Sequence, residues 1–164
     1  MNRSKCFLVS LSLLLLPLPQ VAAQDSGDKG SFYTVAEYGI DRDPAADLQA
    51  TVDRAQEEGK RILIEVGGEW CGWCKLLDGF IHDHEGVSGK LEAGFLIMKV
   101  NYSSENRNEA FLGQYPEIRG YPHIFVLEKD GTFLYSKNTV ELEEGPSYNE
   151  QAILDFLDEW MPGG

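Results

Sequence analysis

Hydrophobic and polar positions along the chain follow first a helical and then a strand pattern. After the Asp-Pro pair at 43–44, apolar residues recur at spacings of three and four until Gly59, which predicts an amphipathic helix over 44–58. Residues 62–66 then form an apolar run that a single acid, Glu65, interrupts. Such a run is typical of a strand that is buried on both faces of a sheet.

The rest of the chain predicts further elements of both kinds. We expect helices over 72–78, 87–92 and 108–115, strands over 95–100, 124–127 and 132–135, and a last helix that ends before Pro162. The Asp130-Gly131 step predicts a hairpin, and Ser147 with Glu150 matches a capping box for the last helix. This order of elements predicts an α/β fold with a small mixed sheet flanked by helices.

The first residues of the chain have the pattern of a targeting segment. Arg3 and Lys5 precede an apolar run over 6–16, and small residues follow at 21–23. The run is too short for a membrane-spanning helix, which needs about 20 apolar residues. We therefore expect residues 1–23 to be a cleavable signal peptide. The mature protein is expected to be exported, either periplasmic or secreted, without stable insertion into a membrane.

Length and composition indicate one folded domain. The chain has 164 residues, of which 43% are hydrophobic and 25% charged, as is typical of a globular protein with a buried core. Residues 24–42 begin with a polar, glycine-containing stretch and are expected to form a leader segment, with the domain over 43–164. The net charge of −13 makes nucleic acid an unfavourable partner.

Two cysteines remain after removal of the signal peptide, Cys71 and Cys74, because Cys6 lies within that peptide. They are placed where the strand over 62–66 gives way to a helix. The unpaired N–H groups at a helix start favour a thiolate, so Cys71 is the expected attacking sulfur. Cys74 is the expected resolving cysteine, which closes a disulfide after a mixed disulfide has formed.

Other uses of the cysteine pair stay open at this point. A Cys-x-x-Cys pair is also half of a zinc site, which His82, His84 or His123 would have to complete. The alternative function is therefore a copper or zinc carrier that uses Cys71, Cys74 and a histidine. A fixed structural disulfide is a weaker interpretation, because a bridge between residues three apart restricts the unfolded chain little.

The segment over 70–74, which reads Trp-Cys-Gly-Trp-Cys, resembles the active-site motif of the thioredoxin family. That family has a buried acid six residues before the first cysteine, and Glu65 stands there. It also has a lysine on the next core strand, matched by Lys99, and a cis-proline before the hairpin, matched by Pro122 after Tyr121. The resemblance spans roughly Asp43 to the C-terminus, which is most of the expected mature chain, and implies a thioredoxin-like fold.

Two features depart from the family pattern. The family commonly has Asp at the position of Glu65, and the stretch over 80–94 is longer than in the smallest thioredoxins. The longer stretch, together with Cys-Gly-Trp-Cys, resembles a subgroup of exported thioredoxin-like proteins.

The resemblance implies an enzyme, a thiol:disulfide oxidoreductase that acts on protein cysteines through a reversible Cys71–Cys74 disulfide. We expect a reductase or isomerase rather than a strong oxidase, because Trp73 stands where some oxidising relatives have a thiolate-stabilising histidine. The expected partners are cysteine-containing protein substrates and a separate redox protein, for which a membrane protein is one candidate. We expect neither a cofactor nor a metal.

Glu65 and Lys99 are candidates for roles in proton transfer. A carboxylate buried near Cys74 would be costly when charged, so its pKa should rise and it could accept the proton of the resolving thiol. Glu65 is thus the expected general base, and Lys99 the residue that tunes it. The alternatives are that Glu65 is a partly exposed strand residue paired with Lys99, and that Lys99 is an ordinary surface lysine.

A second group of residues is expected to bind the substrate. Its members are Trp70, Trp73, Tyr121 and Pro122. A cis bond before Pro122 would expose the Tyr121 backbone, against which an extended substrate segment can pair as an added strand. For Trp70 the alternative is a place in the core. For His123, which follows the proline, an approach to the disulfide and a structural role are both open.

Overall fold

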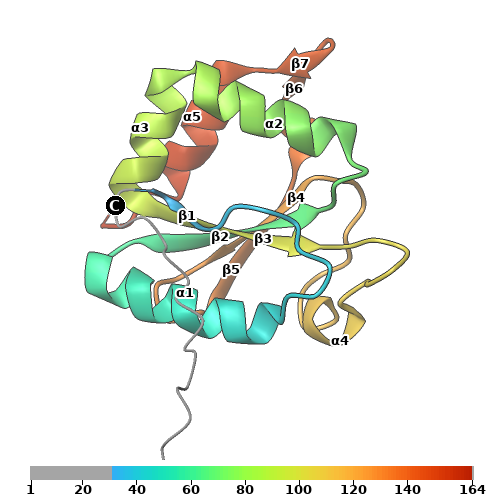
Figure 1. Cartoon of the computed structure of the whole chain (residues 1–164). Coiled ribbons are helices and arrows are strands. Elements are labelled where there is room, and N and C mark those ends of the chain that lie inside the picture. Colours follow the sequence, from blue (N-terminus) through green and yellow to red (C-terminus); the bar gives the residue numbers. More distant parts are fainter. Residues whose placement is uncertain (1–30, 164) are drawn as a thin grey trace, which may run out of the picture.

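A five-stranded mixed sheet lies at the centre of the computed structural model, which describes residues 31–163 (Figure 1). The strands are β1 (Tyr33–Val35), β2 (Arg61–Gly67), β3 (Phe95–Asn101), β4 (His123–Leu127) and β5 (Phe133–Asn138), in the spatial order β1-β3-β2-β4-β5. The helices are α1 (Pro44–Glu58), α2 (Gly72–Asp83), α3 (Glu85–Gly94), α4 (Glu109–Leu112) and α5 (Glu150–Glu159), with a 3₁₀-helix η1 (Thr139–Leu142) and a small hairpin of β6 (Glu143–Glu144) and β7 (Ser147–Tyr148).

Helices cover both faces of the sheet: α2, α3 and α5 lie over one face, and α1 and α4 over the other (Figure 1). β2 runs parallel to β3 and antiparallel to β4, which is antiparallel to β5. Successive side chains of β2 point to opposite faces. Leu63 therefore packs with residues of α2, α3 and α5, whereas Ile62 and Ile64 pack with those of α1 and α4. The predicted mixed sheet flanked by helices is confirmed.

The sequence signals for the first helix are confirmed. The side chain of Asp43 accepts hydrogen bonds from the N–H groups of Ala45 and Ala46, and this caps α1 at its start. Gly59 ends the helix with a φ of 69°, a left-handed conformation that glycine adopts without a steric penalty. α1 has the bounds that were expected, 44–58.

β1 lies within the segment that was expected to be a leader. Tyr33 and Val35 pair in parallel with Ile97 and Met98 of β3, so the folded structure begins before Asp43. A strand of three residues is too short to produce a readable alternation of apolar and polar positions. Its pairing with β3, which is distant in the sequence, is what holds it in the sheet.

α2 extends beyond the expected range of 72–78 and continues through Gly79 to Asp83. A glycine in a helix interior costs about 1 kcal/mol relative to alanine. The helix continues because its inner face, which includes Leu77 and Ile81, is buried against the sheet. Tertiary packing therefore outweighs the local signal that a glycine ends the helix.

The last helix begins differently from the expected capping box. Asn149 is its N-cap residue, and the Asn149 side chain accepts a hydrogen bond from the Ala152 N–H at 2.9 Å. Ser147 instead pairs with Glu144 in the β6–β7 hairpin. The hairpin places Asn149, not Ser147, at the helix entrance.

Among the described residues, no helix combines the length and the apolar character that crossing a bilayer requires. The expected signal peptide, residues 1–23, lies outside the described residues.

Candidate functional site

The two cysteines form a disulfide at the start of α2. Cys71 is the N-cap residue of this helix, and its Sγ accepts a hydrogen bond from the Cys74 N–H at 3.1 Å. The Cys71 N–H in turn donates to the Gly68 carbonyl at 2.9 Å, which fixes the turn between β2 and the helix. Cys74 is fully buried, whereas Cys71 is 3% exposed. An N–H donor and the positive end of a helix are conditions that favour a thiolate at Cys71 after reduction.

Aromatic side chains adjoin the disulfide on an exposed edge. Trp70 is 57% exposed, and its Nε1 donates to the Tyr102 carbonyl at 2.8 Å. The Trp70 ring packs edge-on against Tyr121, which stacks on Tyr102. Tyr121 also packs against the cluster that contains Cys71 and Cys74. Trp70 is therefore not a core residue, and the structure brings it together with Tyr121 beside the sulfurs.

The segment that follows β5 contacts both Pro122 and Trp73. The Tyr121–Pro122 peptide bond is cis, and the Pro122 carbonyl accepts a hydrogen bond from Thr139 Oγ1 at 2.5 Å. The Tyr148 hydroxyl donates to the Trp73 carbonyl at 3.2 Å, and the two rings pack edge-on. Trp73 also packs against the disulfide cluster. The start of α2, which carries Trp73, and the Tyr121–Pro122 segment before β4 are thus both held by one later segment.

Glu65 is buried at the centre of the sheet. It is 2% exposed and pairs in register with Lys99 of β3 and Ile124 of β4. The Tyr38 hydroxyl donates a hydrogen bond to Glu65 Oε1 at 2.5 Å. Burial raises the pKa of Glu65 to about 7, against the opposing effects of the Lys99 charge and the Tyr38 hydrogen bond. The alternative of a partly exposed strand residue is wrong, and this carboxyl group gains and loses its proton near neutral pH.

Lys99 is buried as well, but its ammonium group pairs with a second acid. It is 5% exposed, and its Nζ forms an ion pair with Asp78 of α2. The other oxygen of Asp78 accepts a hydrogen bond from the Tyr33 hydroxyl at 2.9 Å. The Lys99 Nζ lies 5.1 Å from the ring centroid of Tyr33 and 5.3 Å from that of Tyr38. Lys99 is therefore not a surface lysine, and it belongs to a buried cluster that also contains Glu65.

The raised pKa of Glu65 predicts a pH-dependent stability of the oxidised protein. The folded pKa of about 7 lies above the ordinary value of 4.5, so the folded state binds the proton more tightly than the unfolded state does. The stabilisation is fully present below pH 4.5 and is lost as the pH rises through about 7. The free energy of unfolding should fall by about 3 kcal/mol across this interval relative to Glu65→Gln, whose amide does not titrate.

Denaturant unfolding of both proteins across this pH range measures the difference. The comparison cancels the titration of the other acids, which both proteins share. A constant difference between the two free energies of unfolding would contradict the raised pKa.

The chain approaches the disulfide closely at Gly67, the last residue of β2. A Cβ atom at this position would meet Cys74 Sγ at 2.5 Å and the Tyr38 hydroxyl oxygen at 2.9 Å. Any side chain here would force these atoms to move, so only glycine lets β2 reach the buried sulfur. The Cys74 sulfur and the Tyr38 hydroxyl oxygen therefore both lie close to the backbone at Gly67.

The histidines do not build a metal site with the cysteines. Across residues 31–163, no three His, Cys, Asp or Glu side chains are placed so that they could hold a metal ion. His82 is exposed near the end of α2, and His84 stacks on Phe80 with ring centroids 3.7 Å apart. His123 is buried on β4, where its Nε2 is hydrogen-bonded to Ser136 Oγ at 2.8 Å and burial lowers its pKa.

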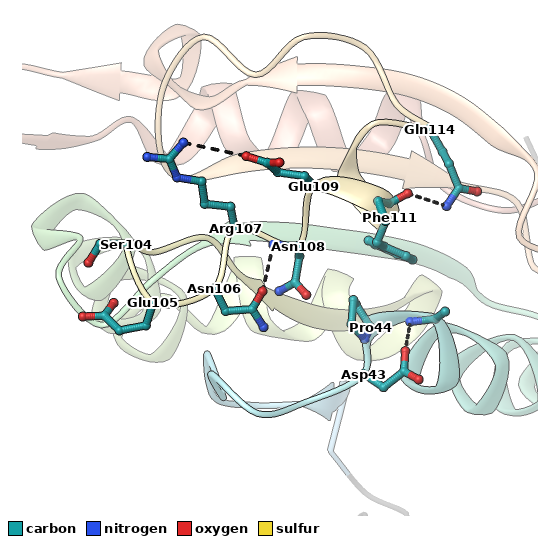
Figure 2. A pocket seen from close by; sticks show the side chains of 12 residues that line it. Asp43, Pro44, Ser104, Glu105, Asn106, Arg107, Asn108, Glu109, Phe111 and Gln114 are labelled. Atoms are coloured by element: carbon teal, nitrogen blue, oxygen red, sulfur yellow. Dashed lines mark hydrogen bonds and ion pairs between the residues drawn. The ribbon is translucent and has the colours of Figure 1, made fainter.

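A separate cavity of about 660 Å³ lies where the loop after β3 passes the start of α1 (Figure 2). Asp43, which caps α1, lines it together with Arg107 and Glu109, whose side chains form an ion pair at 3.7 Å. Its lining contains neither of the two cysteines nor any of the predicted site residues. The candidate site is therefore at the start of α2 and not in this cavity.

Three residues around the site were not predicted from the sequence: Tyr38, Asp78 and Tyr148. Asp78 had a usable signal, because it lies four residues after Cys74 and therefore on the same face of α2. Tyr38 and Tyr148 had none. Tyr38 reaches Glu65 across 27 positions of the sequence, and Tyr148 reaches Trp73 across 75.

The arrangement of sheet, helices and cysteine pair defines a protein of the thioredoxin-fold class. A family model described as thioredoxin-like matches residues 43–129, which is more than half of the chain, and the chain belongs to this thioredoxin-like family. Solved structures show the same fold. A disulphide isomerase from Xylella fastidiosa Temecula1 superposes with a TM-score of 0.64 at 22% identity, over 74% of this chain and 94% of that one. The oxidised C-terminal domain of Neisseria meningitidis DsbD gives a TM-score of 0.54 at 19% identity, over 76% and 99% of the two chains.

Curated proteins also match the sequence. The thiol:disulfide interchange protein DsbD of Pseudomonas sp. (strain JR1 / K1) is 25% identical over 149 residues, which are 90% of this chain and 24% of that protein. A protein disulfide-isomerase of Ricinus communis is 31% identical over 74 residues, which are 44% of this chain and 14% of that protein. The chain thus spans about a quarter or less of the length of these relatives.

Proposed function

We propose that the mature protein is a thiol:disulfide oxidoreductase that acts on protein cysteines through reversible formation of the Cys71–Cys74 disulfide. The observation that carries the proposal is the place of this disulfide, at the N-terminal end of α2 and beside an exposed aromatic edge. The names of the relatives, thiol:disulfide interchange protein and protein disulfide-isomerase, support the same activity.

In the reducing direction, the reaction has two exchange steps. The Cys71 thiolate attacks a substrate disulfide, forms a mixed disulfide and expels one substrate thiolate. Cys74 then attacks Cys71 Sγ, the Cys71–substrate bond breaks, and the second substrate thiolate leaves. Two electrons pass from the cysteine pair to the substrate. Glu65 acts as the general base for the Cys74 thiol, and the charge of Lys99 favours the ionised form of Glu65.

The proposed substrates are extended or flexible polypeptides. Trp70 and Tyr121 offer exposed and half-buried aromatic surface next to the sulfurs. The Tyr121–Pro122 segment lies at the entrance to β4, where the backbone of a substrate can pair as an added strand. Trp73 packs against the disulfide cluster and completes the proposed substrate-binding group.

We place the protein outside the cytoplasm as a reductase or isomerase, not a strong oxidase. The pattern of residues 1–23 supports export, and Trp73 supports the direction because no histidine stands between the cysteines. A reductase in such a compartment needs a separate redox protein that returns electrons to the cysteine pair, and a membrane protein is a candidate for that role.

Equilibration of the mature protein with glutathione buffers, followed by quantification of the Cys71–Cys74 disulfide, tests both parts of the proposal. A reduction potential near about −270 mV would support a reductase or a reductively maintained isomerase, whereas one near about −120 mV would overturn this direction and indicate an oxidase. If the disulfide did not exchange with glutathione at any ratio of its reduced and oxidised forms, the proposed activity itself would be contradicted.

A further inference from the structure

Tyr38 places a hydroxyl group near both the buried acid and the disulfide. It lies in the segment between β1 and α1, is 5% exposed and belongs to one buried cluster with Cys71 and Cys74. Its hydroxyl donates to Glu65 Oε1 at 2.5 Å. Tyr38 is thus hydrogen-bonded to the expected proton acceptor of the second step and lies in the cluster that contains the proton donor, Cys74.

The close approach at Gly67 locates the Tyr38 hydroxyl relative to Cys74. The Cys74 Sγ and the Tyr38 oxygen lie 2.5 Å and 2.9 Å from the same point, so they are separated by no more than the sum of these distances. Reduction removes the bond that ties Cys74 Sγ to Cys71, and the sulfur can then turn about its Cα–Cβ bond. A phenol oxygen that donates one hydrogen bond can accept another, here from the Cys74 thiol.

We propose that the Tyr38 hydroxyl carries the proton of the Cys74 thiol to Glu65 when Cys74 attacks the mixed disulfide. The inference rests on the proposed function, because it assigns the path of the proton in that reaction. It gives a catalytic task to a residue of the segment that precedes α1.

The relay balances in protons and electrons. The Cys74 S–H bond breaks and its proton passes to the Tyr38 oxygen, while the Tyr38 proton passes to the Glu65 carboxylate. The Cys74 electron pair forms the bond to Cys71 Sγ, and the pair of the breaking Cys71–substrate bond leaves on the substrate thiolate. Glu65 ends neutral and Tyr38 ends as it began. In the reverse direction the same path returns the proton to Cys74.

The charges around Tyr38 suit a group that passes a proton without holding a charge. Glu65 faces it from β2, Lys99 from β3, and Asp78 from α2, while Tyr33 of β1 contributes a second phenol. Burial and the Glu65 carboxylate raise the pKa of Tyr38 above its ordinary value, so the phenol stays neutral at physiological pH. Tyr38 therefore transfers the proton without keeping it, and Glu65 is the group that ends the step protonated.

The variant Tyr38→Phe tests the relay, and Tyr33→Phe is its matched control. Both changes remove one hydroxyl near Lys99, from the half-buried Tyr33 or the buried Tyr38, but only Tyr38 is hydrogen-bonded to Glu65 and belongs to the disulfide cluster. The reduced proteins are mixed with a chromogenic aromatic disulfide in a stopped-flow instrument. Attack by Cys71 releases the first coloured thiolate, and attack by Cys74 releases the second, so the two steps are timed separately.

In Tyr38→Phe we expect an unchanged first release and a second release slower by roughly 100-fold. The Tyr38 hydrogen bond lowers the pKa of Glu65, so its loss also moves the rise of the second rate with pH to higher values. At higher pH, where Glu65 is ionised, the second rate reaches a plateau. The relay predicts that this plateau stays below that of the wild type, because the path for the proton is missing. Tyr33→Phe should match the wild type in both releases.

A plateau equal to that of the wild type would overturn the relay and leave Tyr38 as a residue that only tunes Glu65. An unchanged second rate at every pH would overturn it as well, while the proposed oxidoreductase activity would stand. If the wild-type protein gave no release, the proposed function would fail, and the relay would fail with it. Urea unfolding of the oxidised variants confirms that each rate belongs to a folded protein.

Discussion

Replacing Cys74 with serine is expected to trap covalent complexes with substrates, whereas replacing Cys71 with serine is expected to abolish exchange. Cys71 caps α2 and accepts a hydrogen bond from the Cys74 N–H, so we expect its sulfur to react first. In Cys74→Ser the mixed disulfide forms and then persists, because no resolving thiol follows. Non-reducing electrophoresis with a model disulfide protein measures the trapped fraction, and turnover should be lost in both variants.

The double variant Cys71→Ser/Cys74→Ser is the control for adducts that form through other sulfurs. Trapping by Cys71→Ser in place of Cys74→Ser would reverse the assigned roles of the two cysteines. Trapping by neither variant, with an active wild type, would mean that exchange does not pass through a mixed disulfide on this pair.

Replacing Glu65 with glutamine should slow the attack of Cys74 on the mixed disulfide by about 100-fold or more, the range that general-base catalysis supplies. The amide keeps the shape of the side chain and can still accept the Tyr38 hydrogen bond, but it cannot take a proton. The first step, attack by Cys71, should be unchanged. In the wild type the second rate should rise with pH through about 7, as Glu65 ionises, and this rise should be absent from the variant.

Glu57→Gln makes the same chemical change on the exposed surface of α1 and should leave both rates as they are. Equal second rates in wild type and Glu65→Gln would remove the general base from the mechanism. The two-release stopped-flow assay described for Tyr38 serves here too, so the rates of all variants are directly comparable.

The main elements of the fold could be predicted because their signals are local. The caps at Asp43 and Gly59 mark α1 within the sequence itself, and the apolar run around Glu65 marks β2. β1 could not be found in this way, because three residues carry no period. The extension of α2 past Gly79 depends on the sheet beneath it.

The sequence predicted Cys71, Glu65 and Lys99 as site residues, but it did not indicate how the charges of Glu65 and Lys99 pair. Lys99 is the register partner of Glu65, yet its ammonium group forms an ion pair with Asp78. The choice depends on side-chain directions between a strand and a helix, which no spacing rule encodes. The hydroxyl that contacts Glu65 comes from Tyr38, in a stretch that gave no helical or strand pattern.

If Tyr38 passes the proton to Glu65, an active fragment has to include β1 and the turn after it. The match to the family model begins at Asp43, but the residues around the buried acid include Tyr38, which lies upstream. A protein trimmed to the family match would keep both sulfurs, Glu65 and Lys99 while opening their enclosure to water. For this chain, the segment that the family model matches is therefore shorter than the segment that the proposed chemistry would require.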